Sequence, residues 1–423
     1  MHPIRSFTFS CLALIVLVGL SGQAFATTVI VGTCKTGVHF STIGAAVTAA
    51  PVGATIDVCP GTYPEQVAIS KNLTLIGIAS GTSDAAVVVT PATGLVQNGL
   101  DIYGNPVAAQ IFVQGGADVT ISHLTVDGSN NQLSGCGAPD PIGIYYQNSS
   151  GKITDNAVRD VLMDPADQGC QLGLAINVES NTGTPAVTIS DNSVRNYDKN
   201  GITVSGPATG APGPDATVSA NTVIGLGATS VIAQNGIQIG FGATGSVTSN
   251  YVADDIYTGP TYGSSGILIY DSAGITVTSN TVESTQLAIV PVTDPTYFGT
   301  GDGTVIKSNH VGGTQNFDAL DLCSDGNTAQ SNTIYGSAQS GIHLDDTCPP
   351  STGSSNTVNT NTINEACAGI LIGPSSSGNA IGTNTFMNVT NTTLTGSDSC
   401  SPLAQVAGKH HSLRPSPSKP NRN

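Results

Sequence analysis

Residues 266–282 read Gly-Ile-Leu-Ile-Tyr-Asp-Ser-Ala-Gly-Ile-Thr-Val-Thr-Ser-Asn-Thr-Val, two short alternating segments separated by a polar turn. The closing phrase, an Asn followed two residues later by an aliphatic or aromatic residue, occurs nine times between Asp155 and Phe386. The intervals between the asparagines are 36, 29, 29, 30, 29, 23, 29 and 23 residues, so a basic period near 23 residues grows by loop insertion. A fixed period of this length identifies a repeat protein. The nine residues are Asn156, Asn192, Asn221, Asn250, Asn280, Asn309, Asn332, Asn361 and Asn384.

The periods also contain a second alternating phrase, Gly-Ile-Xaa-Ile or a close variant, which begins at Gly201, Gly236, Gly266, Gly341 and Gly369. Alternation at period two places the aliphatic residues on one face of a strand, and no segment between the strands carries a helical stripe. Three short strands per turn predict an all-β fold, a parallel β-helix solenoid. The recurrent Asn suits a tight bend, where its side chain bonds to neighbouring backbone and tolerates a left-handed conformation. Stacked about 4.8 Å apart, these residues should form an internal ladder.

The chain is expected to begin with a cap for the open end of the solenoid. Ser41 can cap a short amphipathic helix that ends at Ala50, before Pro51. Such a helix would cover the first coil of the core. Glu65 and Lys71, in the turns that follow, are interpreted as solvated residues.

The sequence predicts three parts. Residues 1–26 resemble a signal peptide, with Arg5, an apolar run and Ala24-Phe25-Ala26 as the cleavage site. Residues 27–400 form a single β-helix domain, which we expect to be monomeric. Residues 401–423 contain six Lys, Arg or His residues and no acid, and should be a disordered basic tail. No later stretch is long and apolar enough to span a membrane, so the protein is expected to be secreted, extracellular or periplasmic.

Eight cysteines remain after removal of residues 1–26, an even number that suggests disulfides in an oxidising compartment. Proximity in sequence favours four pairs, although other connectivities stay open. These pairs are Cys34 with Cys59, Cys136 with Cys170, Cys323 with Cys348, and Cys367 with Cys400.

The opening of the domain resembles secreted right-handed parallel β-helix proteins. The resemblance is carried by Phe40-Ser41-Thr42-Ile43 through Ala50, by Pro60-Gly61-Thr62-Tyr63-Pro64-Glu65-Gln66-Val67 and by Leu73-Thr74-Leu75-Ile76-Gly77. It points to the pectinesterases and the pectate-lyase-like superfamily, and the later repeats are similar to generic repeats of that group. The resemblance implies the fold over residues 38–395 and a polysaccharide as the substrate or ligand. No specific enzyme subfamily matches, because the signature phrases of pectinesterases and polygalacturonases are missing.

Charge narrows the class of partner. Between Thr27 and Cys400 there are 7 Lys plus Arg and 28 Asp plus Glu, a formal balance of 7 − 28 = −21. This charge opposes binding of nucleic acid. It would also repel a uronate polymer unless calcium intervened, so the expected partner is a neutral or calcium-bridged polysaccharide.

One cluster is the best candidate for catalysis. Asp321 and His343 lie 22 residues apart, one plain coil, and Asp345 follows His343 on the same strand face. Two carboxylates and an imidazole on adjacent rungs can supply acid and base roles. The alternative is that these residues have no catalytic role and simply form part of a polar face near the Cys323–Cys348 pair. A second charged group, Arg195, Asp198 and Lys199 with Arg159 one coil earlier, is interpreted more simply as a salt-bridged turn.

Outward-facing and loop residues supply candidates for ligand binding. Aromatic rings beside carboxylates suit sugar stacking or cation coordination, and loops on rigid scaffolds often carry binding. Asp345 and Asp346 are candidate calcium ligands. The binding candidates are Tyr145, Asp254, Asp255, Tyr257, Tyr262, Tyr270 and Tyr297.

Three functions stay open at this point. The first is a secreted protein that binds a polysaccharide through an exposed sheet and loops and cleaves it as a lyase or hydrolase, with Asp321, His343 and Asp345 as catalytic residues. The second is a noncatalytic surface or structural protein, which the missing enzyme signatures favour. The third is a periplasmic accessory protein of the nitrous-oxide-reductase maturation type, a branch of the same repeat group. The scarcity of His and Met ligands speaks against the third.

Overall fold

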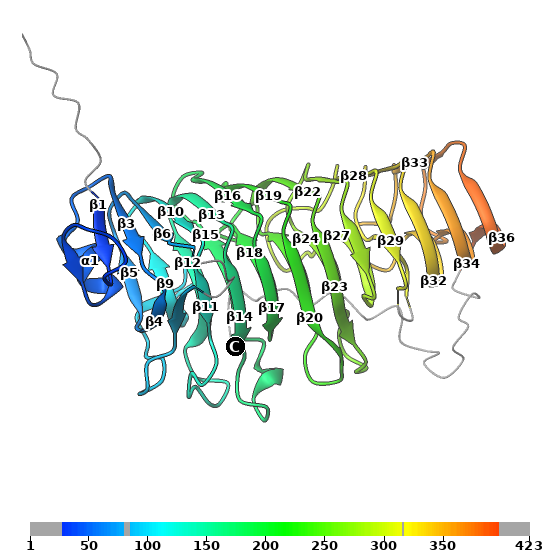
Figure 1. The fold of residues 1–423 in the computed structure, drawn as a ribbon. Helices are drawn as coiled ribbons and strands as arrows, with labels where there is room; N and C mark the ends of the chain where they lie inside the picture. Colours follow the sequence, from blue (N-terminus) through cyan, green and yellow to red (C-terminus); the bar gives the residue numbers. More distant parts are fainter. Residues whose placement is uncertain (1–27, 80–84, 315–316, 397–423) are drawn as a thin grey trace, which may run out of the picture.

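The computed structural model describes residues 28–79, 85–314 and 317–396, whose strands stack along one axis from a helix at one end to β36 at the other (Figure 1). The expected signal peptide, the basic tail and Cys400 lie outside these residues. Apart from β8 with β9, the strand pairings are parallel. The predicted parallel β-helix is therefore confirmed.

Each coil contributes strands to three faces. Face 1 is a 14-stranded sheet. It consists of β1 (Thr28–Val31), β2 (His39–Phe40), β3 (Ala54–Val58), β6 (Leu73–Gly77), β10 (Asp118–Ser122), β13 (Ser150–Thr154), β16 (Ala186–Ser190), β19 (Asp215–Ser219), β22 (Thr244–Thr248), β25 (Thr276–Thr278), β28 (Val305–Lys307), β31 (Thr328–Gln330), β33 (Thr357–Asn359) and β35 (Ala380–Ile381).

Faces 2 and 3 belong to one 22-stranded sheet. Face 2 holds β4 (Gly61–Pro64), β7 (Ala86–Val89), β11 (Thr125–Asp127), β14 (Ala157–Val161), β17 (Ser193–Tyr197), β20 (Thr222–Thr229), β23 (Tyr251–Tyr257), β26 (Thr281–Glu283) and β29 (His310–Gly312). Face 3 holds β5 (Val67–Ile69), β8 (Gly99–Leu100), β9 (Pro106–Val113), β12 (Asp140–Gln147), β15 (Leu174–Glu179), β18 (Asn200–Ser205), β21 (Asn235–Gly240), β24 (Ser265–Tyr270), β27 (Leu287–Val292) and β30 (Leu320–Leu322).

The last three coils join these two faces with continuous bent strands. They are β32 (Thr333–Leu344), β34 (Thr362–Ile372) and β36 (Thr385–Thr395). The pairing of β32 with β34 shifts register between Ser337 and Ser340, where β32 passes from face 2 to face 3. One strand therefore contributes residues to both faces.

The core is a stack of aliphatic side chains from the three faces. A single coil contributes Val277 from face 1, Val282 from face 2 and Ile289 from face 3, each fully buried. Their equivalents in neighbouring coils are also aliphatic, because the alternation of each strand is kept in register. Burying such columns is the main favourable contribution to folding.

The predicted asparagine ladder is present from Asn156 to Asn384. Each side-chain amide donates a hydrogen bond to the side-chain oxygen of the asparagine in the next coil, at 2.9–3.1 Å. The same oxygen also accepts the backbone N–H of the previous asparagine, as Asn280 does from Asn250. The left-handed conformation falls on the residue before each asparagine, such as Ser279 (φ 57°), and not on the asparagine itself.

The terminal helix α1 (Ile43–Ala49) is close to its predicted position, but its caps differ from the prediction. Thr42, and not Ser41, is the N-cap residue, and its hydroxyl accepts the N–H of Ala45. Glu65 accepts the backbone N–H groups of Ile43 and Gly44 at 2.7 and 2.8 Å. Lys71 donates to the carbonyls of Thr48 and Ala50. Glu65 and Lys71 therefore bind the two ends of the helix, where unpaired backbone groups and the helix dipole favour these charges, and they are not simply solvated.

Three of the predicted disulfides are present in the described part of the chain. They join Cys34 to Cys59, Cys136 to Cys170 and Cys323 to Cys348. The fourth predicted pair includes Cys400 and stays a prediction. The 3-10 turn η1 (Gln168–Cys170) carries one of these cysteines. None of the helices in the described residues has the length and apolarity needed to cross a membrane.

Candidate functional site

The outward side of face 3 is covered by loops. Tyr145 stacks on Phe112 with ring centroids 4.9 Å apart, and it is fully buried. Tyr270 is 2 % exposed and packs against Phe241 and Tyr297. The expectation of an exposed sheet on this face is therefore wrong for these tyrosines, because outward residues of neighbouring strands, joined around Tyr270 by loop residues, form additional apolar clusters on this face.

The candidate catalytic residues lie on neighbouring strands of this face. Asp321 of β30 pairs in register with His343 of β32, as their spacing predicts. The Nδ1 atom of His343 lies 3.7 Å from Oδ1 of Asp321 and 3.2 Å from Oδ2 of Asp318. Asp318, two residues before β30, was missed by sequence reasoning because it falls outside the alternating phrase. The Asp–His cluster is defined here as Asp318, Asp321, His343 and Asp345.

Asp318 is held in place by hydrogen bonds from the neighbouring coil. Its Oδ1 accepts the N–H of Ser340 at 2.9 Å and the hydroxyl of the same residue. Its other oxygen faces His343. The two oxygens of Asp318 therefore have separate partners, both on β32.

The protonation of His343 and Asp321 is strongly perturbed. Burial disfavours the charged imidazolium, but the carboxylates of Asp318, Asp345 and Asp321 outweigh it and raise the pKa of His343 to about 10. Burial, together with the charge of Asp345, raises the pKa of Asp321 well above its usual range. Within the described residues, Oδ1 of Asp321 accepts no hydrogen bond. The cluster therefore combines an imidazole whose charged form is favoured with a buried carboxyl group, Asp321, whose neutral form is favoured.

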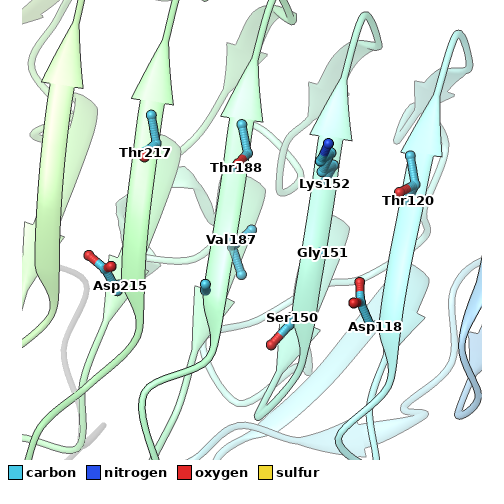
Figure 2. Close-up of a pocket in the computed structure, with 10 residues that line it drawn as sticks. Asp118, Thr120, Ser150, Gly151, Lys152, Val187, Thr188, Asp215 and Thr217 are labelled. Atoms are coloured by element: carbon cyan, nitrogen blue, oxygen red, sulfur yellow. The ribbon is translucent and has the colours of Figure 1, made fainter.

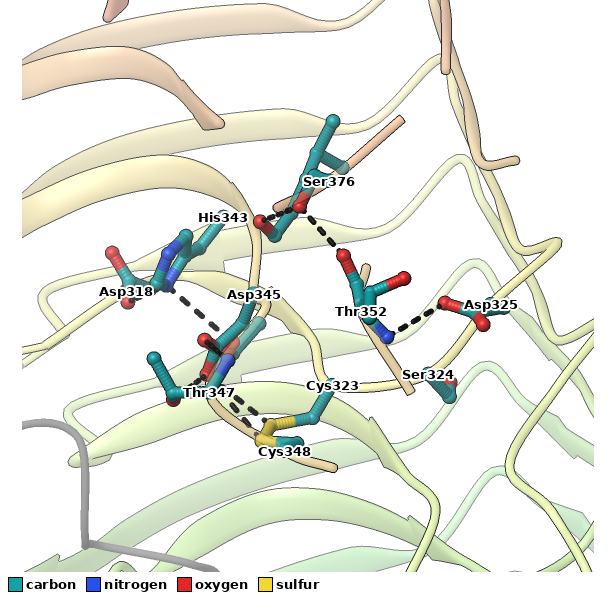
Figure 3. Close-up of a disulfide and its surroundings, with 12 residues drawn as sticks. Asp318, Cys323, Ser324, Asp325, His343, Asp345, Thr347, Cys348, Thr352 and Ser376 are labelled. Atoms are coloured by element: carbon teal, nitrogen blue, oxygen red, sulfur yellow. Dashed lines mark hydrogen bonds and ion pairs between the residues drawn. A yellow bond between two sulfur atoms is a disulfide. The ribbon is translucent and has the colours of Figure 1, made fainter. Parts of the chain in front are cut away.

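Asp345 lies beside the disulfide of the same coil (Figure 3). Its Oδ2 lies 3.3 Å from Sγ of Cys323 and 3.4 Å from Sγ of Cys348. These contacts are not hydrogen bonds, because disulfide sulfurs carry no hydrogen. Asp345 instead accepts hydrogen bonds from the N–H and hydroxyl of Thr347. The sulfurs are covalently paired, so they and Asp345 do not form a metal-thiolate site.

The predicted calcium ligands have separate partners. Both oxygens of Asp345 are engaged by Thr347, whereas Asp346 accepts the N–H of Ser375 from the next coil at 2.7 Å. Calcium needs six to eight oxygen ligands around one point. These contacts do not favour a site shared by Asp345 and Asp346, and calcium binding stays a prediction. Side-chain ligand atoms of Asp318, Asp321 and His343 do lie within 4.8 Å of one another.

The loop candidates for binding do not converge on one place. Asp255 is fully buried and accepts the hydroxyl of Tyr197 at 2.7 Å, and burial raises its pKa well above the usual range. Tyr257 is 6 % exposed, and its ring lies 6.3 Å from that of Tyr262. Tyr262, Asp254 and Tyr297 are half-buried. Several of these residues therefore support the loops rather than present a surface.

The second charged group is split between two environments. Arg159 and Arg195 are paired neighbours on face 2, and Arg159 binds Asp127 at 2.8 Å. Asp198 and Lys199 are instead fully buried. Burial raises the pKa of Asp198 to about 8, and Nζ of Lys199 donates to the carbonyl of Ala233. The interpretation as one salt-bridged turn is therefore wrong for Asp198 and Lys199.

Face 1 carries a shallow depression of about 450 Å³ (Figure 2). Its floor is formed by outward residues of β10, β13, β16 and β19, with Lys152 among hydroxyl and carboxylate side chains. The carboxylates and the imidazole of the Asp–His cluster, by contrast, approach one another closely in a buried setting. The Asp–His cluster is therefore the stronger candidate for chemistry.

Comparisons with known proteins agree with this fold. A family profile described as "Right handed beta helix region" matches residues 211–388, and one described as "Periplasmic copper-binding protein (NosD)" matches residues 88–298. No curated protein matches the sequence. The chain is similar to right-handed parallel β-helix proteins, and it shares their fold.

Solved structures share the fold at low sequence identity. The native GH136 lacto-N-biosidase from Eubacterium ramulus superimposes with a TM-score of 0.55 and 12 % identity, over 86 % of this chain and 68 % of that one. The Dettilon tailspike protein (gp208) has a TM-score of 0.50 and 16 % identity, over 80 % of this chain and 62 % of that one. At these identities the likeness establishes the fold alone.

Proposed function

We propose that this protein is an exported polysaccharide-active β-helix protein that cleaves a glycosidic bond at the Asp–His cluster. The observation that carries the proposal is the placement of two neighbouring carboxyl groups in different environments. Asp318 accepts two hydrogen bonds from Ser340, while burial and the charge of Asp345 raise the pKa of Asp321. Two carboxyl groups in different environments are the usual acid and base of such reactions.

The geometry favours a hydrolase that retains the configuration of the sugar. Oxygens of Asp318 and Asp321 lie within 4.8 Å of each other. In retaining glycosidases the two carboxyl groups are about 5 Å apart, whereas inverting enzymes leave a wider gap for water. Asp321 would protonate the leaving oxygen, and Asp318 would attack or stabilise the developing positive charge on the sugar.

His343 and Asp345 act on the two carboxyl groups. The His343 imidazolium donates a hydrogen bond to Asp318 and orients its carboxylate. The negative charge of Asp345 raises the pKa of both His343 and Asp321. The side chain of His343 is 14 % exposed and that of Asp321 is 11 % exposed, and these edges are where a sugar would enter.

Export is supported by the disulfides. Structural disulfides are typical of oxidising compartments, and three are present here. The match to a periplasmic family over residues 88–298 agrees with that location.

A second candidate is a noncatalytic glycan-binding protein. The burial of the Asp–His cluster favours it, because a substrate has only narrow access to Asp321 and Asp318. On that alternative, the cluster joins β30 to β32 electrostatically, and binding takes place on another surface.

The copper-binding family match suggests a third candidate. Copper(I) prefers soft sulfur ligands, whereas Cu(II) accepts imidazole and carboxylate. The six described cysteines in the three disulfides cannot act as thiolates. Asp318, Asp321 and His343 offer one nitrogen and two oxygens, which fits Cu(II) but not Cu(I). A copper-transfer role is therefore less well supported than action on a glycan.

The test is a cleavage assay on the full chain with disulfides intact. Neutral and acidic polysaccharides are supplied with and without calcium, and new reducing ends and unsaturated-uronate absorbance are measured. We expect the parent to release product. Asp321→Asn and Asp318→Asn should abolish it, whereas Asp346→Asn should retain it, because Asp346 faces Ser375 instead of the cluster. Product that persists in Asp321→Asn, or no product from any polymer, would contradict the proposal.

A further inference from the structure

Face 2 carries an exposed group of aromatic and acidic side chains that the Asp–His cluster does not use. It consists of Tyr251, Glu283, His310 and Tyr335, from four successive strands, and is called the Tyr335 surface here. Among the described residues, three aromatic side chains are strongly exposed, and two of them, Tyr251 (38 %) and Tyr335 (37 %), lie in this group. Exposed aromatic rings gathered on one face often mark a binding surface.

The ring of Tyr335 lies flat over a glycine. Tyr335 is paired with Gly312 in the neighbouring coil, and a Cβ atom on Gly312 would lie 2.2 Å from Cζ of the ring. Any side chain at position 312 would therefore displace the ring. The ring of His310 lies 5.3 Å away, tilted by 43°. The ring of Tyr335 is thus supported by the backbone at Gly312 and by the ring of His310.

Glu283 lies between the two tyrosines. Its Oε1 accepts the hydroxyl of Tyr335 at 3.3 Å, and its Oε2 accepts the hydroxyl of Tyr251 at 3.4 Å. Both distances are long for bonds between a hydroxyl and an oxygen, so the carboxylate retains acceptor capacity. No Lys or Arg forms a salt bridge with Glu283 in the described ranges. The surface thus offers a supported ring beside a half-buried carboxylate acceptor.

We propose that the Tyr335 surface binds a neutral glycan chain. A flat, amphipathic ring packs against the apolar face of a sugar, while a carboxylate accepts its hydroxyl groups. Negative charge at Glu283 and the balance of −21 between Thr27 and Cys400 (7 − 28) oppose an anionic uronate polymer. The inference shares the ligand class of the proposed function but requires no cleavage, since this surface is separate from the Asp–His cluster.

Affinity electrophoresis of the full chain in native gels tests the proposal. The gels contain laminarin, galactomannan or xyloglucan as neutral probes and polygalacturonate as the anionic comparison. At least one neutral probe should retard the protein. Tyr335→Ala and Gly312→Ala should each weaken that retardation about tenfold or more, because the first removes the ring and the second displaces it. Tyr335→Phe should retain most of the binding.

Two control variants show whether retardation depends on the Tyr335 surface itself. Leu226→Ala removes an exposed apolar side chain from the same face and should bind normally. Asp346→Asn, which lies outside both sites, should also bind normally. Retardation tests the Tyr335 surface and the cleavage assay tests the Asp–His cluster, so the two proposals can fail independently. The inference is overturned if no neutral probe retards the protein, if Tyr335→Ala and Gly312→Ala bind as the parent does, or if polygalacturonate is preferred. If choline chloride, without any free glycan, abolishes the retardation, the Tyr335 surface binds a cation, and this result would also overturn the inference.

Discussion

His343 donates to Asp318 across 3.2 Å, from one coil of the solenoid to the next, with Asp321 0.5 Å farther away at 3.7 Å. Three carboxylates surround this single imidazole, and their combined charge outweighs the effect of burial. Stability of this part of the fold therefore depends on one proton.

Replacement of His343 by Gln should change how stability depends on pH. The pKa of His343 is about 10 in the folded chain and near 6.5 when unfolded. Its contribution is therefore complete below about pH 6.5 and is lost as the pH rises toward 10. We expect the parent to exceed His343→Gln in unfolding free energy at pH 6 and the difference to shrink by pH 10. Urea denaturation at both pH values measures it, and a difference that stays constant would contradict the prediction.

Replacement of Asp321 by Asn should leave the protein at least as stable as the parent at pH 8. The pKa of Asp321 is raised, so ionisation of this carboxyl group disfavours the folded state above its ordinary pKa. An amide removes that cost while preserving shape. We expect a gain of up to about 1 kcal/mol at pH 8, which should shrink toward zero at about pH 3, below the ordinary pKa, where the carboxyl group is mostly neutral in both states. Thermal denaturation at the two pH values tests this, and a large loss at pH 8 would show that the carboxylate is needed ionised.

Glu179 should impose a second pH dependence at a different place. Burial, and then the charge of Asp101, raises its pKa to about 7, and its Oε2 accepts the hydroxyl of Tyr145 at 2.8 Å. The folded chain binds this proton more tightly than the unfolded chain, so stability falls as pH rises from about 4.5 to 7 and then levels off. Glu179→Gln should remove at most about 3 kcal/mol of that fall. Urea denaturation at pH 5 and pH 8 measures the change in unfolding free energy. An equal change in the parent and in Glu179→Gln would contradict the prediction.

Replacement of Asn280 by Ala should interrupt the asparagine ladder. Its side chain donates to Val247 and Asn309 and accepts from Asn250, and all of these groups are buried. Unpaired buried groups each cost about 1–3 kcal/mol, so the unfolding free energy should fall by about 3 kcal/mol or more. Asn181→Ala, at an exposed site whose amide makes one bond of 3.4 Å, serves as the control and should change it by less than about 0.5 kcal/mol. Equal effects of the two changes would show that the ladder contributes little.

The fold could be predicted from the sequence because every coil repeats the same local pattern. The asparagines and the alternating strands are sufficient to place Asn280, Val282 and Ile289 on their faces. The pairing of Asp321 with His343 followed from their spacing of 22 residues, one plain coil. Where loops interrupt the repeated sequence pattern, the register between strands of successive coils could not be predicted from spacing alone. In the structure Tyr145 pairs with Asn177, and Leu268 pairs with Val290.

The candidate site could be predicted only in part, because contacts between coils and with loops leave no periodic signal. Tyr145 and Tyr270 have the right outward phase, yet Phe112 of the neighbouring strand stacks on Tyr145 and Phe241 of a loop packs on Tyr270. Asp318 lies outside the strand phrase, so spacing gave no reason to select it. The Tyr335 surface was missed for a different reason: it depends on the absence of a side chain at Gly312, a contact between coils that alternation does not reveal.

Strand β32 carries Tyr335 near its start and His343 near its end, on either side of the corner between two faces. On the two proposals, a long polymer could occupy both places together, whereas a short oligosaccharide could reach only one. Tethering at the first place raises the local concentration of the polymer at the second. Chain length, as well as sugar identity, would then determine how strongly a substrate is retained. The separation of Tyr335 and His343 along β32 would set the length of the shortest polymer that reaches both places.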